Sequence, residues 1–226
     1  MRATRIVLAS PLLAVLLLTD GILISLHNWL WHTGQLVTVP QFNIEMQGGV
    51  AEYFNYLKWL TCSLACLWLF ARRREPVYLA WGALFLYLLV DDAESIRDSA
   101  GAWIVSVMGT GPEFAEILVS FIAGAVLLAP IAIRYRRNDI EARAFSRLLF
   151  PWLIALVIFG VGFDTLHAMV GHWSVVSTFM GVVEDGGEMI VGSILTSLVC
   201  LQAFAARRVQ RVTVSNESVP VKADSF

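Results

Sequence analysis

The segment Ile117–Ile133, ILVSFIAGAVLLAPIAI, decides the class of fold, because none of its residues is charged. An α-helix needs about 20 mostly apolar residues to cross the hydrocarbon core of a bilayer. With its flanks, this segment forms a predicted span over 113–133 that is long enough. The sequence therefore favours an integral membrane protein over a soluble domain.

Five further apolar segments of similar kind occur along the chain, with predicted bounds 6–26, 55–71, 77–94, 148–171 and 183–206. Of the 226 residues, 58% are hydrophobic and 15% are charged, whereas soluble domains average about 45–50% and about 25%. We therefore predict an all-α membrane bundle of about six transmembrane helices. It forms one domain over 1–211, and a polar, disordered cytoplasmic tail follows over 212–226.

Basic residues predict how this bundle is oriented. They collect in the connections on one side, as Arg2 and Arg5, Arg72–Arg74, five arginines within 134–147, and Arg207, Arg208 and Arg211. The connections on the other side hold only Lys58 and Arg97. Because short cytoplasmic loops are enriched in Lys and Arg, both termini are expected in the cytoplasm. Trp59 and Trp103 fall at the outer ends of spans, where interfacial aromatic residues are common.

Acidic residues and histidines collect on the opposite, outer side. Thirteen of the 18 acidic residues and all four histidines fall there. At 1.5 Å rise per residue, Asp91, Asp164 and Glu188 lie roughly 21–27 Å from the inner ends of their spans. Ionisable groups at such depth usually face the bundle interior and mark a functional site. Other outer acids are expected to be ordinary solvated loop residues, namely Glu45, Glu52, Asp98 and Asp185.

Helical spacing sorts the deeper residues into pairs, because residues three or four apart share a helix face. Carboxylates packed together must share protons, pair with bases or bind metal, and helical bundles build metal centres from such Glu and His residues. We predict a divalent transition metal (zinc, iron or manganese), bound by Asp91, Glu94, Asp164, His167, Glu184 and Glu188. A further pair, Glu113 and Glu116, is expected to supply a catalytic base or to support the ligands.

Three strings carry a resemblance to a family. Asp91–Asp98 (DDAESIRD), Phe163–His167 (FDTLH) and Glu184–Met189 (EDGGEM) resemble motifs of small uncharacterised bacterial multi-pass membrane proteins. The resemblance covers these strings and the order of the spans, and Arg97–Asp98 stands where the family pattern has His-Glu. It implies a protein of the bacterial inner (plasma) membrane with acidic and histidine motifs at the outer helix ends. It implies no particular activity.

Three classes of function remain open. The first is a metal-dependent enzyme whose site opens outward, with the metal activating water or an acceptor. Its partners would be the lipid bilayer and a lipid, a quinone or a small periplasmic substrate; nothing in the sequence indicates nucleic-acid binding. The second is a cation or proton transporter, for which Ser193, Thr196 and Ser197 offer a hydroxyl path. The third is a non-catalytic membrane subunit or chaperone. The one-sided ionisable residues favour a site over a path.

Overall fold

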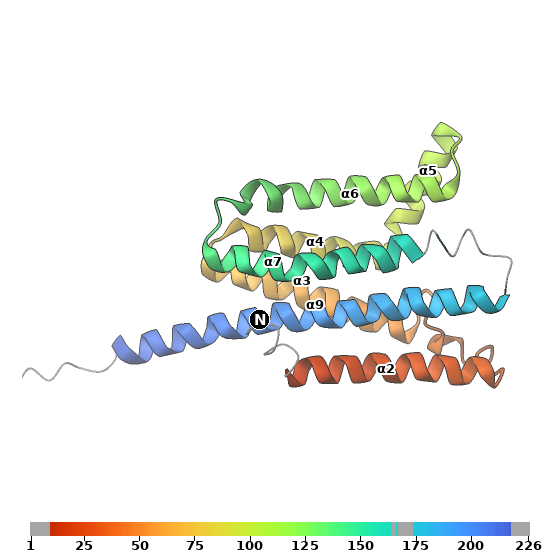
Figure 1. The fold of residues 1–226 in the computed structure, drawn as a ribbon, viewed down its shortest axis with the longest axis horizontal. Helices are drawn as coiled ribbons and strands as arrows, with labels where there is room; N and C mark the ends of the chain where they lie inside the picture. Colours follow the sequence, from red (N-terminus) through yellow and green to blue (C-terminus); the bar gives the residue numbers. More distant parts are fainter. Residues whose placement is uncertain (1–9, 164–165, 167–173, 218–226) are drawn as a thin grey trace, which may run out of the picture.

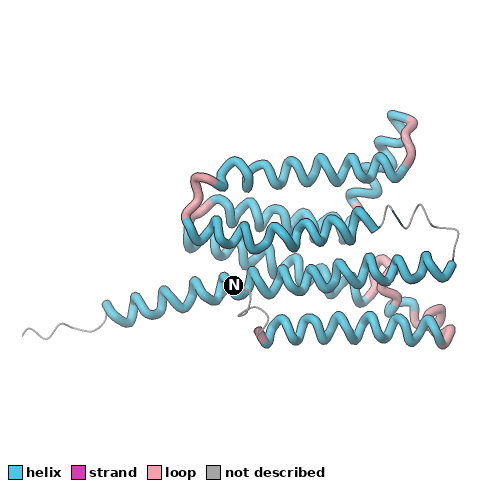
Figure 2. The backbone as a smooth tube through the Cα atoms, in the orientation of Figure 1, coloured by secondary structure: helices cyan, strands magenta, loops and turns pink. Residues whose placement is uncertain are grey.

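Seven α-helices make up the part of the chain that the computed structural model describes, which is residues 10–163, 166 and 174–217. Side chains are described for the same residues except 113, 174–178 and 208–217. Six long helices run along one common direction, and the short α5 lies at an angle to them (Figure 1). The described residues include no strand, and loops and turns join the helices, among them the long connection 33–49 between α2 and α3 (Figure 2). In chain order the elements are α2 (Pro11–His32), η1 (Pro40–Phe42), α3 (Val50–Arg73), α4 (Pro76–Glu94), α5 (Ile96–Met108), α6 (Pro112–Tyr135), α7 (Ile140–Val157), η2 (Ile158–Phe163) and α9 (Ser174–Glu217).

Prolines and caps account for several helix ends. Pro11, Pro76 and Pro112 each stand in the first turn of a helix, where the missing N–H would have no intrahelical partner. Asp139 starts α7, because its side chain accepts a hydrogen bond of 2.6 Å from the Ala142 amide. At Arg74 the backbone turns left-handed, with φ 57°, and this separates α3 from α4.

Five segments are long and apolar enough to cross a membrane: Pro11–His32, Pro76–Glu94, Phe114–Tyr135, Ile140–Phe163 and Phe179–Arg207. Their outer faces carry large exposed apolar side chains, such as Phe121 (73% exposed) and Ile133 (74%). Lipid suits faces of this kind better than water does. The chain is thus a helical multi-pass membrane protein. The remaining predicted span lies within α3, which has 24 residues but carries Glu52, Lys58 and terminal arginines.

The centre of the bundle is formed by α3, α4 and α9. Helix α3 packs on both α4 and α9, α2 and α7 pack on α9, and α6 packs on α4 and α5. Aromatic rings join α3 to α4, because Phe85 stacks at 6.0 Å from Trp81 and at 6.1 Å from Trp59, all three being buried. The core therefore lies along α3, and the site described below begins where this core ends.

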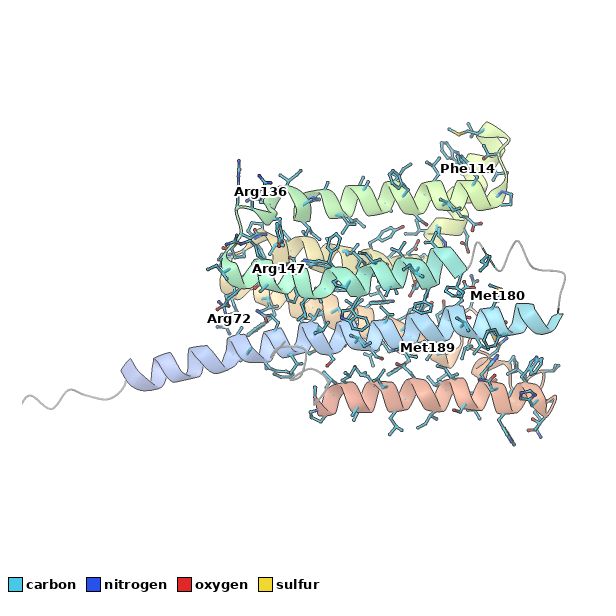
Figure 3. All side chains as sticks on the ribbon, viewed as in Figure 1. Arg72, Phe114, Arg136, Arg147, Met180 and Met189 are labelled. Carbon is cyan, nitrogen blue, oxygen red and sulfur yellow. The ribbon has the colours of Figure 1, made fainter. Side chains whose placement is uncertain are left out.

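Charge divides the bundle into two ends. Figure 3 places Arg72, Arg136 and Arg147 at one end, which we call the arginine end, and Phe114 and Met180 toward the other. The carboxylates at the last turn of α4 lie toward that second end, which we call the acidic end. The two-ended distribution of charge that the sequence indicates is therefore present in the bundle.

Several helix bounds differ from the predicted spans. Helix α7 begins at Ile140 instead of 148, because Asp139 caps it, and its first turns carry the charged residues Glu141, Arg143 and Arg147. Helix α3 begins at Val50 instead of 55, and α2 ends at His32 instead of 26. The predicted spans omit α5, which is too short to be recognised as one. Helix α9 continues to Glu217, into the segment expected to be a disordered tail.

Candidate functional site

A pocket of about 330 Å³ lies between α3, α4, α6, α7 and α9, with residues 44–47 at its border. Its deeper wall is apolar and includes Leu84 of α4, Leu128 of α6 and Leu153 of α7. Each of these leucines lies several helical turns away from the acidic end of its helix. Toward the acidic end the wall becomes polar. The pocket therefore has an apolar part within the bundle and a charged part at its end.

Seven carboxylates line the pocket, and they come from separate parts of the chain. They are Glu45, Glu52, Asp91, Asp92, Asp98, Asp185 and Glu188. Among the described residues of the lining, Arg97 is the only basic one. Four of the seven are acids expected to be solvated loop residues. Glu45 and Asp98 are indeed exposed, but Glu52 and Asp185 are half-buried. Helix α3 begins at Val50 instead of 55, which carries Glu52 into the wall, whereas Asp185 lies within the predicted span 183–206.

Asp92 is held between α3 and α4. The Trp59 indole Nε1 donates to its Oδ2 at 2.9 Å, and the Tyr56 hydroxyl donates to its backbone carbonyl at 3.0 Å. Trp59 is only 3% exposed, so the indole is fixed by the core on one side and by this carboxylate on the other. A carboxylate oriented by a buried donor keeps its second oxygen available to the pocket.

Asp91 organises the turn between α4 and α5. Its Oδ1 accepts the Arg97 backbone amide at 2.9 Å and the Tyr87 hydroxyl at 3.5 Å. Arg97 lies in the first turn of α5, where amides lack intrahelical partners. Ser95 between them is left-handed, with φ 47°. Asp91 therefore caps α5, which accounts for one of its two oxygens without any ligand.

Arg97 and Glu188 meet at Gly160 in η2. The Arg97 Nη1 donates to the Gly160 carbonyl at 3.1 Å. The Glu188 carboxylate of α9 lies directly against Gly160, so a β-carbon there would collide with Oε1. Arg97 also lies 3.6 Å, through its Nε, from Oδ1 of Asp98. These contacts join α5, η2 and α9 at the pocket wall, and the Glu188 carboxylate would have to move if residue 160 carried a β-carbon.

A buried ion pair lies next to the pocket, at the junction of α2, α3 and α9. The Lys58 ammonium is 2.7 Å from Oδ1 of Asp20. It also donates to Oδ1 of Asn55 at 3.0 Å and to the Met189 carbonyl at 2.9 Å. The Ser193 hydroxyl donates to the second Asp20 oxygen at 2.6 Å. Because Asn55 and Met189 also line the pocket, the pair supports part of its wall.

Of the described histidines, His27 is the buried one. His27 is 1% exposed, and its Nδ1 accepts the Ile44 amide at 3.3 Å. The ring proton of a neutral imidazole then belongs to Nε2, which has no hydrogen-bond partner within the described part of the chain. His27 fixes the segment that carries Glu45 but does not itself line the pocket.

The predicted metal ligands do not all meet in this pocket. Asp91 and Glu188 line it, whereas Glu94 is exposed and Glu184 is half-buried, both outside the lining. Asp164 and His167 fall outside the described residues. Of the predicted bases, Glu116 packs against Gly101 of α5, and only the backbone of Glu113 is described. Glu116 is not part of the lining.

Sequence reasoning missed three residues that shape the site: Asp92, Trp59 and Arg97. Asp92 follows Asp91 directly, so the rule that pairs residues three or four apart passes over it. Trp59 had been expected at the membrane interface. Trp59 lies one turn after Asn55 and two turns after Glu52, on a helix with Lys58, and this was the signal that this face of α3 is polar and buried.

The carboxylates of this lining need positive charge to offset their own. With seven carboxylates and one guanidinium, the formal charge is strongly negative, and protons or cations must offset it. Among the described residues, no three His, Cys, Asp or Glu side chains come together closely enough to hold a metal ion. The described carboxylates therefore provide a negative field and single oxygen ligands, not a closed coordination shell.

The chain belongs to a family of unknown function, because the family model described as Domain of unknown function (DUF8692) matches residues 6–204. The match includes all the helices up to the last turns of α9. No curated protein and no solved structure matches the chain. The family agrees with the resemblance to an uncharacterised family, and it carries no activity to this chain.

Proposed function

We propose that this protein binds a cation in the pocket at its acidic end. One observation carries the proposal: seven carboxylates and a single arginine line one pocket, which is flanked by the apolar interior of a membrane bundle. Five of the seven are half-buried, and carboxylates within a membrane bundle are costly unless a proton or a cation offsets their charge. Glu188 of α9 and Asp92 of α4 come from different helices, so a cation between them would also join α4 to α9.

A divalent transition metal is the first cation to test. Asp91 and Glu188 remain proposed ligands, Asp92 and Asp185 join them from the lining, and Asp164 and His167 are retained on the sequence argument alone. An imidazole among carboxylates suits zinc, iron or manganese. A bound metal would supply Lewis acidity or a metal-activated water, and a lining carboxylate not used as a ligand would act as base.

The proposed setting is the bacterial inner membrane, with six spans that include α3 and with both termini in the cytoplasm. This orientation places the arginine end inside and the pocket on the outer side. The reaction would then act on a lipid, a quinone or a small periplasmic substrate. The variants Thr38→Cys, in the connection between α2 and α3, and Arg136→Cys test the orientation when they are labelled with a thiol reagent that cannot cross membranes. Only Thr38→Cys should react in intact cells.

Metal analysis and calorimetry on detergent-purified protein test the proposal. We expect Mn²⁺ or Zn²⁺ to bind with about one ion per chain, and Glu188→Gln or Asp92→Asn to weaken it by about 10- to 100-fold. The matched control is Glu141→Gln, a carboxylate at the arginine end that pairs with Arg73 at 2.7 Å. Equal affinity in wild type, Glu188→Gln and Glu141→Gln would overturn a metal at this pocket.

Transport of a cation or proton is the second candidate, and the buried polar residues of α9 favour it. Ser193, Thr196 and Ser197 are at most 3% exposed, and they continue from the Lys58–Asp20 pair toward the arginine end. Cys62 lies 3.4 Å from the Thr196 hydroxyl, which extends the polar line to α3. Proteoliposome flux that is lost in Ser193→Ala and Thr196→Val, with the fold retained, would support transport; unchanged flux would exclude this path.

A further inference from the structure

The apolar half of the pocket faces a boundary between two helices that are not closely packed. Helix α6 packs on α4 and α5, whereas α7 packs on α9 and η2. Both α6 and α7 nevertheless line the pocket, through Leu127 and Leu128 on one side and Leu153 and Leu156 on the other. The pocket is therefore a groove between α6 and α7 at its deeper end.

Two observations indicate that this groove is open. A β-carbon on Gly124 of α6, which lines the pocket, would meet no atom within 4 Å. Val157 of α7 also lines the pocket, yet its side chain is 54% exposed. Both residues lie within segments that are long and apolar enough to span the bilayer. The opening is thus toward the hydrocarbon region and not only toward the acidic end.

We propose that the pocket takes an amphiphile with a positively charged head group, whose hydrocarbon chain lies between α6 and α7. The inference rests on the proposed cation site and names the cation as part of a membrane-borne molecule. Charge complementarity selects the head group, because an anionic head would face the same carboxylates that a cation offsets. The volume of about 330 Å³ is at the low end for ligand sites, so it suits a head group and the first part of a chain.

Entry from the bilayer explains why two kinds of wall occur in one pocket. A chain that moves from lipid into the groove gains little hydrophobic free energy, because lipid tails are as apolar as leucine. The head group then supplies selectivity through Asp92 and Glu188, and the groove supplies orientation. Binding should consequently depend on the charge of the head more than on the length of the chain.

Photocrosslinking in nanodiscs tests this proposal. The probe is a long-chain primary amine with a diazirine on its chain, and competitors are the same amine without diazirine and the alcohol of equal chain length. We expect crosslinks in 120–128 and 153–161, displaced by the amine and not by the alcohol. Crosslinks spread over the outward faces of all helices, or equal displacement by amine and alcohol, would overturn the proposal.

Two glycine variants separate this proposal from cation binding as such. Gly124→Leu fills the groove and should lower crosslinking by about 10-fold or more, which is a loss of about 1.4 kcal/mol of binding free energy. Gly21→Leu is the control, because a β-carbon at Gly21 on α2 also meets no atom within 4 Å. Divalent metal affinity should be unchanged in Gly21→Leu, which lies outside the pocket lining. Metal binding without amine crosslinking would overturn the amphiphile and leave the cation site; loss of both in wild type would overturn the two together.

Discussion

Lys58 and Asp20 form an ion pair of 2.7 Å in which each side chain is only 1% exposed. An ammonium group has three donors, and here they go to Asp20, Asn55 and the Met189 carbonyl. Ser193 satisfies the second oxygen of Asp20. The pair therefore joins α2, α3 and α9 through bonds that are all made, which is the condition under which charges persist inside a membrane bundle.

Removing one partner of this pair should destabilise the bundle strongly. Lys58→Met leaves the Asp20 carboxylate buried without its counter-charge, and Asp20→Leu leaves the ammonium in the same position. Each single variant is expected to lose about 3–5 kcal/mol of unfolding free energy. Equilibrium unfolding in mixed detergent micelles, followed by circular dichroism, measures this loss.

The double variant Asp20→Leu/Lys58→Met is the informative comparison, because it removes both charges at once. It should recover most of the loss, since a buried pair replaced by apolar residues of similar volume is often neutral in stability. Additive losses in the double variant would contradict this account, and would mean that packing around α2 and α3 dominates.

Asp91→Ala should loosen α5 more than it affects the rest of the bundle. The Asp91 carboxylate accepts the Arg97 amide at 2.9 Å in the first turn of that helix, and loss of such a cap costs about 0.5–2 kcal/mol. Amide hydrogen exchange over 96–108 should accelerate by roughly 2- to 30-fold, which is the same range of free energy.

The control for Asp91 is Asp98→Ala, an exposed acid in the same turn that contacts Arg97 only at 3.6 Å. Exchange in α5 should change little in this variant, because exposed ion pairs contribute about 0–1 kcal/mol. If Asp98→Ala accelerates exchange as much as Asp91→Ala does, the charge at the start of α5 matters and the specific cap does not.

Much of the fold could be predicted from the sequence, because lipid leaves few alternatives. Within an apolar run such as 117–133, lipid offers no partner to the backbone N–H and C=O groups. The run must therefore satisfy them internally, as a helix of span length does. The helix ends were less accessible. Asp139 caps α7 well before the apolar run begins, and α5 is a 13-residue helix whose length says nothing about a membrane.

The candidate site was predicted only in part, and the reason is geometric. Spacing along one helix identifies residues that share a face, such as Asp91 and Glu94, but not which face meets a neighbour. In the bundle, Glu94 is exposed, whereas Asp92 accepts a hydrogen bond from the Trp59 indole. Contacts between helices of distant sequence, such as Arg97 with Gly160 and Lys58 with Met189, carry no signal in a single sequence.

Trp59→Phe should isolate the role of the indole N–H. Phenylalanine keeps an aromatic ring beside Phe85, but it cannot donate to the Asp92 carboxylate. We expect a loss of about 1–3 kcal/mol in unfolding free energy, because a partly buried acceptor loses its partner. Trp103→Phe is the control, since that side chain is 66% exposed; a similar loss there would show that ring size and not the hydrogen bond is responsible.

Gly160→Ala should displace Glu188 without disturbing the helix around it. A β-carbon at Gly160 collides with the Glu188 carboxylate, whereas a β-carbon at Gly162, two residues later in η2, meets no atom within 4 Å. Both changes replace glycine by alanine in the same element, so they share any effect on backbone freedom. The difference between them therefore reports the contact between η2 and α9.

If Glu188 is a ligand, Gly160→Ala should weaken cation binding by about 10- to 100-fold, as loss of a supporting contact does at metal sites, and Gly162→Ala should leave it unchanged. Calorimetry with Mn²⁺ on the two variants decides the matter, because equal affinities would remove Glu188 from the site.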